Sequence, residues 1–73
     1  MKPDTAIPAI AANVEALDWL VNEAAARTTE AHAYLRRGDR NAAIGTILDI
    51  DVMLTDAIAL YRATVALHRR RPL

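Results

Sequence analysis

The chain has 73 residues, which is enough for one domain but leaves little interior for a hydrophobic core. It contains no cysteine, which excludes disulfides, thiol catalysis and cysteine-ligated zinc. Nine basic residues balance nine acidic ones, and no apolar run approaches the ~20 residues that cross a bilayer, so we expect a cytoplasmic protein with no membrane contact.

A first helix is expected over about residues 6–37, after a short polar lead. Asp4 or Thr5 is the expected N-cap, and Pro8 falls in the first turn, where proline is tolerated. Glu23 is placed to pair with Arg27 one turn later. Apolar residues recur at alternating spacings of three and four, which predicts one seam along the helix. The seam residues are Ile7, Ile10, Val14, Leu17, Val21, Ala24, Thr28, Ala31 and Leu35.

The strongest turn signal lies at residues 38–40. Gly38 suits the end of the first helix, and either Asp39 or Asn41 can cap the next one. Weaker helix formers at Thr28 and Thr29 leave open whether the first helix is kinked before it reaches this turn.

A second helix is expected over about residues 41–70. Its seam has the same spacing, and residues that face each other across the two seams lie at equal distances from Asp39 along the chain. Alanines then repeatedly face large side chains, as interdigitated layers require. The pattern predicts an all-α protein with one domain, residues 1–73, folded as a coiled-coil-like antiparallel hairpin of two helices. The second seam is Ala43, Ile47, Ile50, Leu54, Ala57, Tyr61, Thr64 and His68.

The second helix has more apolar surface than one seam can cover. Met53, Leu60 and Leu67 extend one flank, and Ile44, Ile58 and Val65 extend the other. Because soluble monomers rarely expose so much apolar surface, we expect a homodimer that forms a four-helix bundle. The expected core of the dimer or bundle is Val14, Leu17, Val21, Ile47, Ile50, Leu54, Ile58, Tyr61 and Val65.

The titratable residues do not indicate an enzyme. His32 and His68 fall near opposite ends of the hairpin, and the Glu-x-x-His spacing of di-iron bundles is absent. No glycine-rich phosphate loop or nucleophile elbow occurs. We therefore expect no catalytic residue, no metal and no cofactor.

A protein partner is the favoured use of the remaining surface. Trp19 lies on the polar side of the first helix, where it either covers its own helix or, with Leu20, anchors a partner. Met53 and Leu60 on the second helix complete the set of expected partner-binding residues.

Nucleic acid is the alternative partner. Arg62, Arg69, Arg70 and Arg71 gather at the end of the second helix, where they either grip phosphates or form a solvated helix terminus. The plasmid copy-number regulator Rop, a small helical-hairpin dimer, binds RNA, so the architecture permits this use. Acidic residues on the same helix weaken the positive field.

The length, the two-helix build, the Glu15–Leu20 segment and the apolar flank resemble those of small phage-encoded helical proteins that bind and silence a bacterial host protein. Among these are quorum-sensing anti-activators of LuxR-type regulators and inhibitors of the pilus-assembly ATPase. The resemblance implies a stoichiometric inhibitor in the host cytoplasm that covers an apolar patch of its target, such as a transcription regulator or an assembly ATPase.

Overall fold

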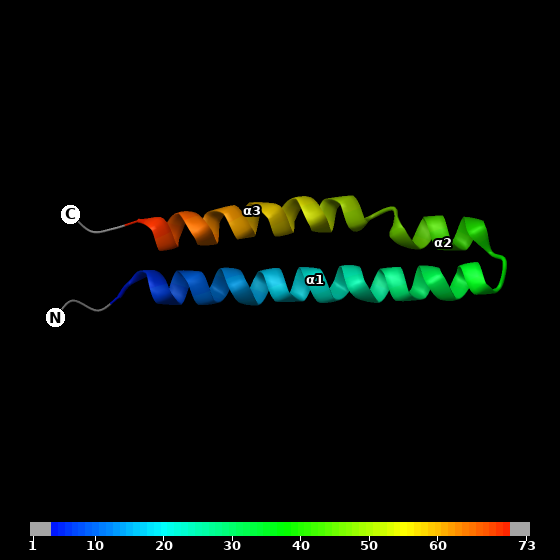
Figure 1. The fold of residues 1–73 in the computed structure, drawn as a ribbon, viewed down its shortest axis with the longest axis horizontal. Helices are drawn as coiled ribbons and strands as arrows, with labels where there is room; N and C mark the ends of the chain where they lie inside the picture. The colour runs from blue at the N-terminus through cyan, green and yellow to red at the C-terminus, as the bar shows by residue number, and fades with distance from the viewer. Residues whose placement is uncertain (1–3, 71–73) are drawn as a thin grey trace.

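The computed structural model describes residues 4–70, which form a helical hairpin (Figure 1). The first arm is α1 (Ala6–Arg36). The second arm consists of α2 (Arg40–Ile47) and α3 (Ile50–Arg69), which run back along α1. The predicted all-α hairpin is confirmed over these residues, and none of them forms a strand.

The first helix begins at the polar lead. The Oδ1 atom of Asp4 accepts a hydrogen bond from the backbone N–H of Ala6 at 3.0 Å, whereas the Thr5 side chain makes no capping bond. The hydroxyls of Thr28 and Thr29 both donate to the carbonyl oxygen of Ala25, so these polar groups are satisfied within the helix. The helix runs from Ala6 to Arg36 without interruption.

The turn is closed by two backbone hydrogen bonds typical of a Schellman motif. The N–H of Gly38 donates to the carbonyl of Leu35, and the N–H of Asp39 donates to that of Tyr34, both at 3.0 Å. Gly38 has a φ of 76°, a left-handed conformation that favours glycine. Of the two expected caps, Asp39 serves: its Oδ1 accepts from the N–H of Ala42 at 3.0 Å.

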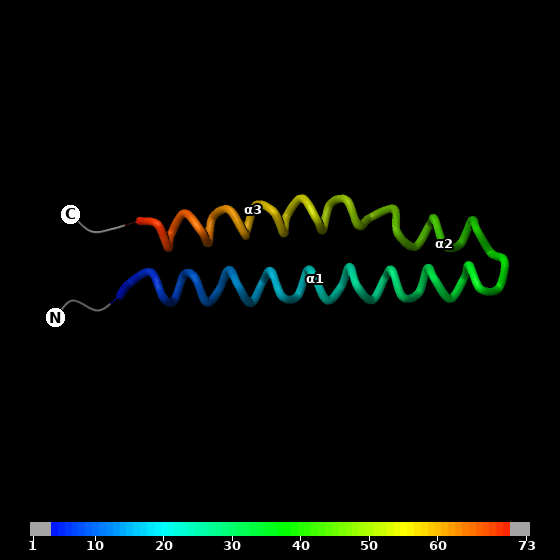
Figure 2. Tube along the Cα trace, in the orientation of Figure 1, coloured from blue at the N-terminus to red at the C-terminus, as the bar shows by residue number. Residues whose placement is uncertain are grey.

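The second arm differs from the prediction of one continuous helix over residues 41–70. It is interrupted at Leu48 and Asp49, where the trace leaves the helical path (Figure 2). The sequence around this point favours an interruption, because Gly45 and the β-branched Thr46 and Ile47 are weak helix formers. Beyond it, the Asp51 side chain accepts a bond from the N–H of Val52, which competes with regular helical bonding.

The two arms pack along one seam, called here the hairpin seam. Its residues are half-buried or buried and recur at alternating spacings of three and four, as expected for a coiled coil. On α1 they are Ile10, Asn13, Leu17, Leu20, Ala24, Arg27, Ala31 and Tyr34. On α2 and α3 they are Ala43, Thr46, Ile50, Met53, Ala57, Leu60, Thr64 and Leu67.

The hairpin seam shares only half of its residues with the predicted seam. Leu17 and Ile50 lie in both, and Val65 is half-buried. The other expected core residues, Val14, Val21, Ile47, Leu54, Ile58 and Tyr61, are exposed in the single chain. This corrects the placement of all of them except Ile58, a flank residue, between the two arms. The reason is that each arm is rotated so that the neighbouring heptad row, one residue away, faces the other arm.

The hairpin is long and thin. Its Cα radius of gyration is 17.3 Å, compared with roughly 11 Å for a compact domain of this length. Among the described residues, the buried hydrophobic side chains are four alanines, Ala24, Ala31, Ala43 and Ala57. No large side chain of the described chain is fully buried.

Candidate protein-binding surfaces

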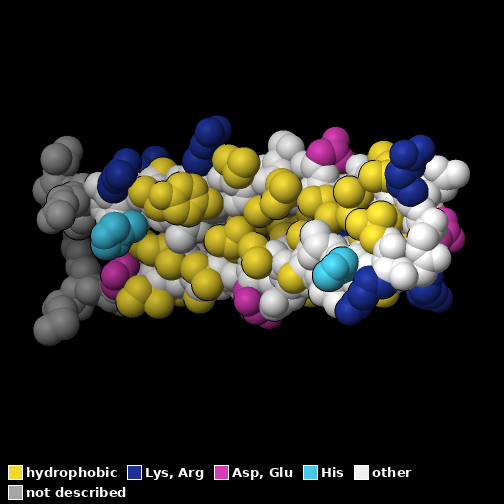
Figure 3. Space-filling view, turned by 45° about the vertical axis from the view of Figure 1, so that its right-hand side comes forward, with side chains coloured by type: hydrophobic (Ala, Val, Ile, Leu, Met, Phe, Trp, Pro, Cys, Tyr) yellow, Lys and Arg dark blue, Asp and Glu magenta, His cyan; other side chains and the backbone are white. Residues whose placement is uncertain are grey.

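The first candidate surface is a continuous apolar stripe that we call the apolar face. Figure 3 shows hydrophobic side chains gathered along both arms on one side of the molecule. The exposed residues that form the apolar face are Ile7, Val14, Val21 and Leu35 on α1, and Ile44, Ile47, Leu54, Ile58 and Tyr61 on α2 and α3.

Heptad geometry explains why these residues share one side. Val21 directly follows Leu20 of the hairpin seam, and Leu54 directly follows Met53. In an antiparallel pair of heptad helices, such equivalent positions next to the seam lie on the same side of the pair. The two rows therefore flank the hairpin seam together and form one surface.

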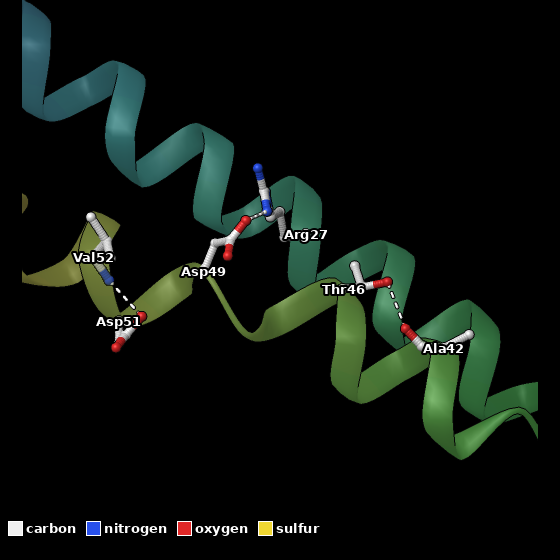
Figure 4. A network of polar contacts seen from close by, with 6 residues as sticks. All are labelled: Arg27, Ala42, Thr46, Asp49, Asp51 and Val52. Carbon is white, nitrogen blue, oxygen red and sulfur yellow. Dashed lines mark hydrogen bonds and ion pairs between the residues drawn. The ribbon is translucent and has the colours of Figure 1, made fainter.

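The opposite side of the seam is polar. There the Arg27 guanidinium pairs with Asp49 across the two arms, with an N–O distance of 3.0 Å (Figure 4). The expected pairing of Arg27 with Glu23 is thus replaced by a contact between the arms. The Arg27 and Asp49 side chains are 32% and 73% exposed, so solvent screening limits this pair to roughly 0–1 kcal/mol.

The sequence did not single out Asp49 as a partner of Arg27. A signal was present, because Arg27 belongs to a heptad row that borders the side of the hairpin on which Asp49 lies. The pairing depends on which heptad row of α1 faces the second arm, and the apolar pattern indicated the neighbouring row instead.

The second candidate surface is a shallow groove around Trp19 on the outer side of α1. Two alanines, Ala12 and Ala16, belong to its lining, and the Trp19 side chain is 62% exposed. The lining residues are Ala12, Glu15, Ala16, Asp18, Trp19, Asn22 and Glu23. Three of these carry carboxylates and none is basic, so the groove has a negative rim.

The other three expected partner-binding residues do not join Trp19. Leu20, Met53 and Leu60 are half-buried in the hairpin seam, where the two arms cover them. The flank of the second helix that was expected to be free is therefore used within the chain. Trp19 is the member of the expected set that stays exposed.

The arginines at the end of α3 are exposed. Arg62 and Arg69 are one heptad apart and so lie on one row, with Arg70 beside them. Arg71 lies outside the described residues. Asp56, also exposed, precedes Arg62 by six residues.

Within residues 4–70, no three His, Asp or Glu side chains are close enough to hold a metal ion together. The same residues contain no buried side-chain nitrogen or oxygen without a hydrogen-bond partner. No helix of this part of the chain combines the length and apolar character needed to cross a membrane.

The fold and its surfaces define a helical hairpin with an unpartnered apolar face and a separate tryptophan groove. Comparison with protein-family models, with curated proteins and with solved structures found no match for this chain.

Proposed function

We propose that this chain is a non-enzymatic helical protein that acts as a homodimer and regulates another protein by binding it. The observation that carries the proposal is the groove around Trp19. A large aromatic side chain that stands exposed above small residues is the type of residue that dominates binding energy in protein interfaces.

The groove favours a partner surface that carries basic residues. Glu15, Asp18 and Glu23 surround Trp19 and supply negative charge without a neighbouring arginine in the lining. An arginine of the partner can stack on the indole ring while its guanidinium meets these carboxylates. The chain's resemblance to phage-encoded inhibitors makes a transcription regulator or an assembly ATPase the favoured target and inhibition the favoured outcome.

Affinity capture from the native cell tests this proposal with three forms of the tagged chain. We expect one protein to be captured by the wild type and by Leu48→Ala, but not by Trp19→Ala. Leu48 is a matched control, because it is a large apolar residue that is 67% exposed and lies away from the groove. The captured protein is then purified and titrated against each form.

In that titration we expect Trp19→Ala to weaken binding by about 2 kcal/mol or more, which is the usual cost of removing a hot-spot residue. The Leu48→Ala form should bind like the wild type. Equal affinity of all three forms would show that the groove is not the binding site. Trp19 is the single tryptophan of the chain, so its fluorescence reports binding directly.

The alternative function is that of a Rop-like nucleic-acid-binding regulator. The exposed row formed by Arg62 and Arg69, with Arg70 beside it, is the observation that favours it. Salt separates the two functions, because phosphate contacts release counterions and weaken steeply as salt rises. Capture of RNA or DNA that is lost in Arg62→Ala and at high salt, and kept in Trp19→Ala, would favour the alternative.

A further inference from the structure

The apolar face points in a different direction from the contact between the two arms. In the sequence, the apolar side of the first helix is centred between the rows of Val21 and Ala24. That of the second helix is centred between the rows of Leu54 and Ala57. The hairpin seam is instead centred between the rows of Leu20 and Ala24 on α1, and between the rows of Met53 and Ala57 on the second arm. On an α-helix this change of centre is a rotation of about 50°. Both arms show it, toward the same side of the hairpin.

This rotation matches the geometry of a four-helix bundle. In a square bundle, the direction from one helix to its neighbour differs by about 45° from the direction to the bundle centre. The hairpin supplies the neighbour contact through its seam. The apolar pattern points to a centre that lies beyond the hairpin, on the side of the apolar face.

The single hairpin also lacks a core of its own. Its surface is 6073 Å², whereas a compact monomer of 8.0 kDa exposes about 4,400 Å². The difference of roughly 1,600 Å² is about twice the ~800 Å² that each partner buries in a standard interface. The buried side chains of the described residues are alanines, whereas large apolar side chains lie exposed on the apolar face.

The chemistry of the apolar face suits a second copy of the same surface. Between the ends of the helices, the rows of Val21 and Leu54 contain no charged side chain, and Asp51 is the one charged residue on the row of Ile44 and Ile58. Thr28, the polar member, donates its hydroxyl to the Ala25 carbonyl at 2.8 Å and therefore needs no outside partner. A two-fold axis can place the rows of Val21 and Leu54 against their copies without repulsion. The polar side, with Glu23, Asp49 and Asp56, would repel its own copy.

We infer that a second copy of this chain covers the apolar face, so that Val14, Val21, Leu54, Ile58 and Tyr61 form the centre of a two-fold symmetric four-helix bundle. This inference deepens the proposed function, since it names the surface through which the proposed homodimer forms. Trp19 lies outside that surface, so each copy keeps its groove free for another protein.

A matched pair of substitutions tests the inference. Val21 and Val52 are 52% and 60% exposed in the single chain, but only Val21 belongs to the apolar face. Light scattering at micromolar concentration should give about twice the chain mass for the wild type and for Val52→Glu. For Val21→Glu we expect a dissociation constant raised at least about a hundredfold, because the substitution occurs twice across the two-fold axis.

A second measurement covers the case in which Val21→Glu does not fold. The chain has no cysteine, so Val21→Cys and Val52→Cys each carry a single thiol. As protein concentration rises, maleimide modification of Val21→Cys should slow at least about tenfold, because dimerisation buries the thiol. The rate for Val52→Cys should stay constant.

A wild type that remains monomeric at micromolar concentration would overturn the inference. So would equal slowing of the two thiols, because the dimer would then use a different face. No other protein takes part in either measurement, so a failed capture experiment leaves this result untouched. A monomeric wild type, in turn, leaves the binding role of Trp19 open to its own test.

Discussion

The two glycines of the chain differ in backbone conformation. Gly38 has a φ of 76° at the end of α1, whereas Gly45 lies inside α2 with helical geometry. An added Cβ atom would meet nothing within 4 Å at either position. Any effect of Gly→Ala on stability therefore comes from the backbone and not from crowding.

We expect Gly38→Ala to destabilise the hairpin by about 1–2 kcal/mol, because alanine strains the left-handed conformation that the turn requires. Chemical denaturation followed by circular dichroism measures this difference.

The matched control, Gly45→Ala, should stabilise the protein by about 0.5–1 kcal/mol, because alanine loses less backbone freedom when the helix forms. Destabilisation by both substitutions would show that Gly45 is needed for a contact beyond the single chain.

Residue-scale features were predictable from the sequence where they depend on near neighbours. Gly38 and Asp39 follow turn and capping rules that span a few residues, and both serve as expected. The partner of Arg27 was not predictable in this way. Glu23 is close in the sequence, but Asp49 is brought alongside by the packing of the arms.

At the scale of elements, the interruption of the second arm is the main departure from the single helix expected over residues 41–70. The N–H of Met53 reaches the carbonyl of Asp49 at 3.5 Å, a long hydrogen bond, at the start of α3. The Arg27–Asp49 pair lies at the same level and tethers the interrupted segment to α1. A tether between exposed groups restrains this segment only weakly.

We expect the backbone amides of Leu48 and Asp49 to exchange with solvent faster than those of α1 at Ala24 and Ala31. Helical hydrogen bonding is interrupted at the former pair and continuous at the latter. Hydrogen exchange followed by NMR gives the rates residue by residue. Protection that is uniform from Ile44 to Asp56 would instead indicate one continuous helix.

The heptad pattern predicted the helices better than the rotation of each helix about its own axis. Spacings of three and four identify a helix and its apolar side, and both arms have them. They do not say whether that side faces one neighbour or the centre of several helices. Val21 and Leu54 illustrate the difference: both fit the pattern, yet both are exposed in the single chain.

At the scale of the whole molecule, the expected partner-binding residues lie on different sides of the hairpin. Trp19 was identified from its type and its position among alanines, and the structure leaves it exposed. Leu20, Met53 and Leu60 were grouped with it because an apolar flank looks the same whether another arm or another protein covers it. Only the packing of the chain assigns them to the hairpin seam.

The apolar face has a thermodynamic consequence for the molecule as a whole. If two copies form the core together, folding and association are one reaction, because the hairpin by itself buries mainly alanine. Apparent stability then depends on protein concentration. A tenfold increase in concentration should add about 1.4 kcal/mol to the apparent free energy of unfolding of the dimer.

For a dimer of this size, the same tenfold increase should raise the midpoint of thermal unfolding by about 5 °C. Circular dichroism at several concentrations measures the midpoint. The Val52→Glu form should follow the wild type, whereas Val21→Glu should unfold at a lower temperature at every concentration, because its dimer is weaker. A wild-type midpoint that stays constant over a hundredfold range would show that the hairpin folds alone, since mass action shifts every equilibrium in which one folded dimer gives two unfolded chains.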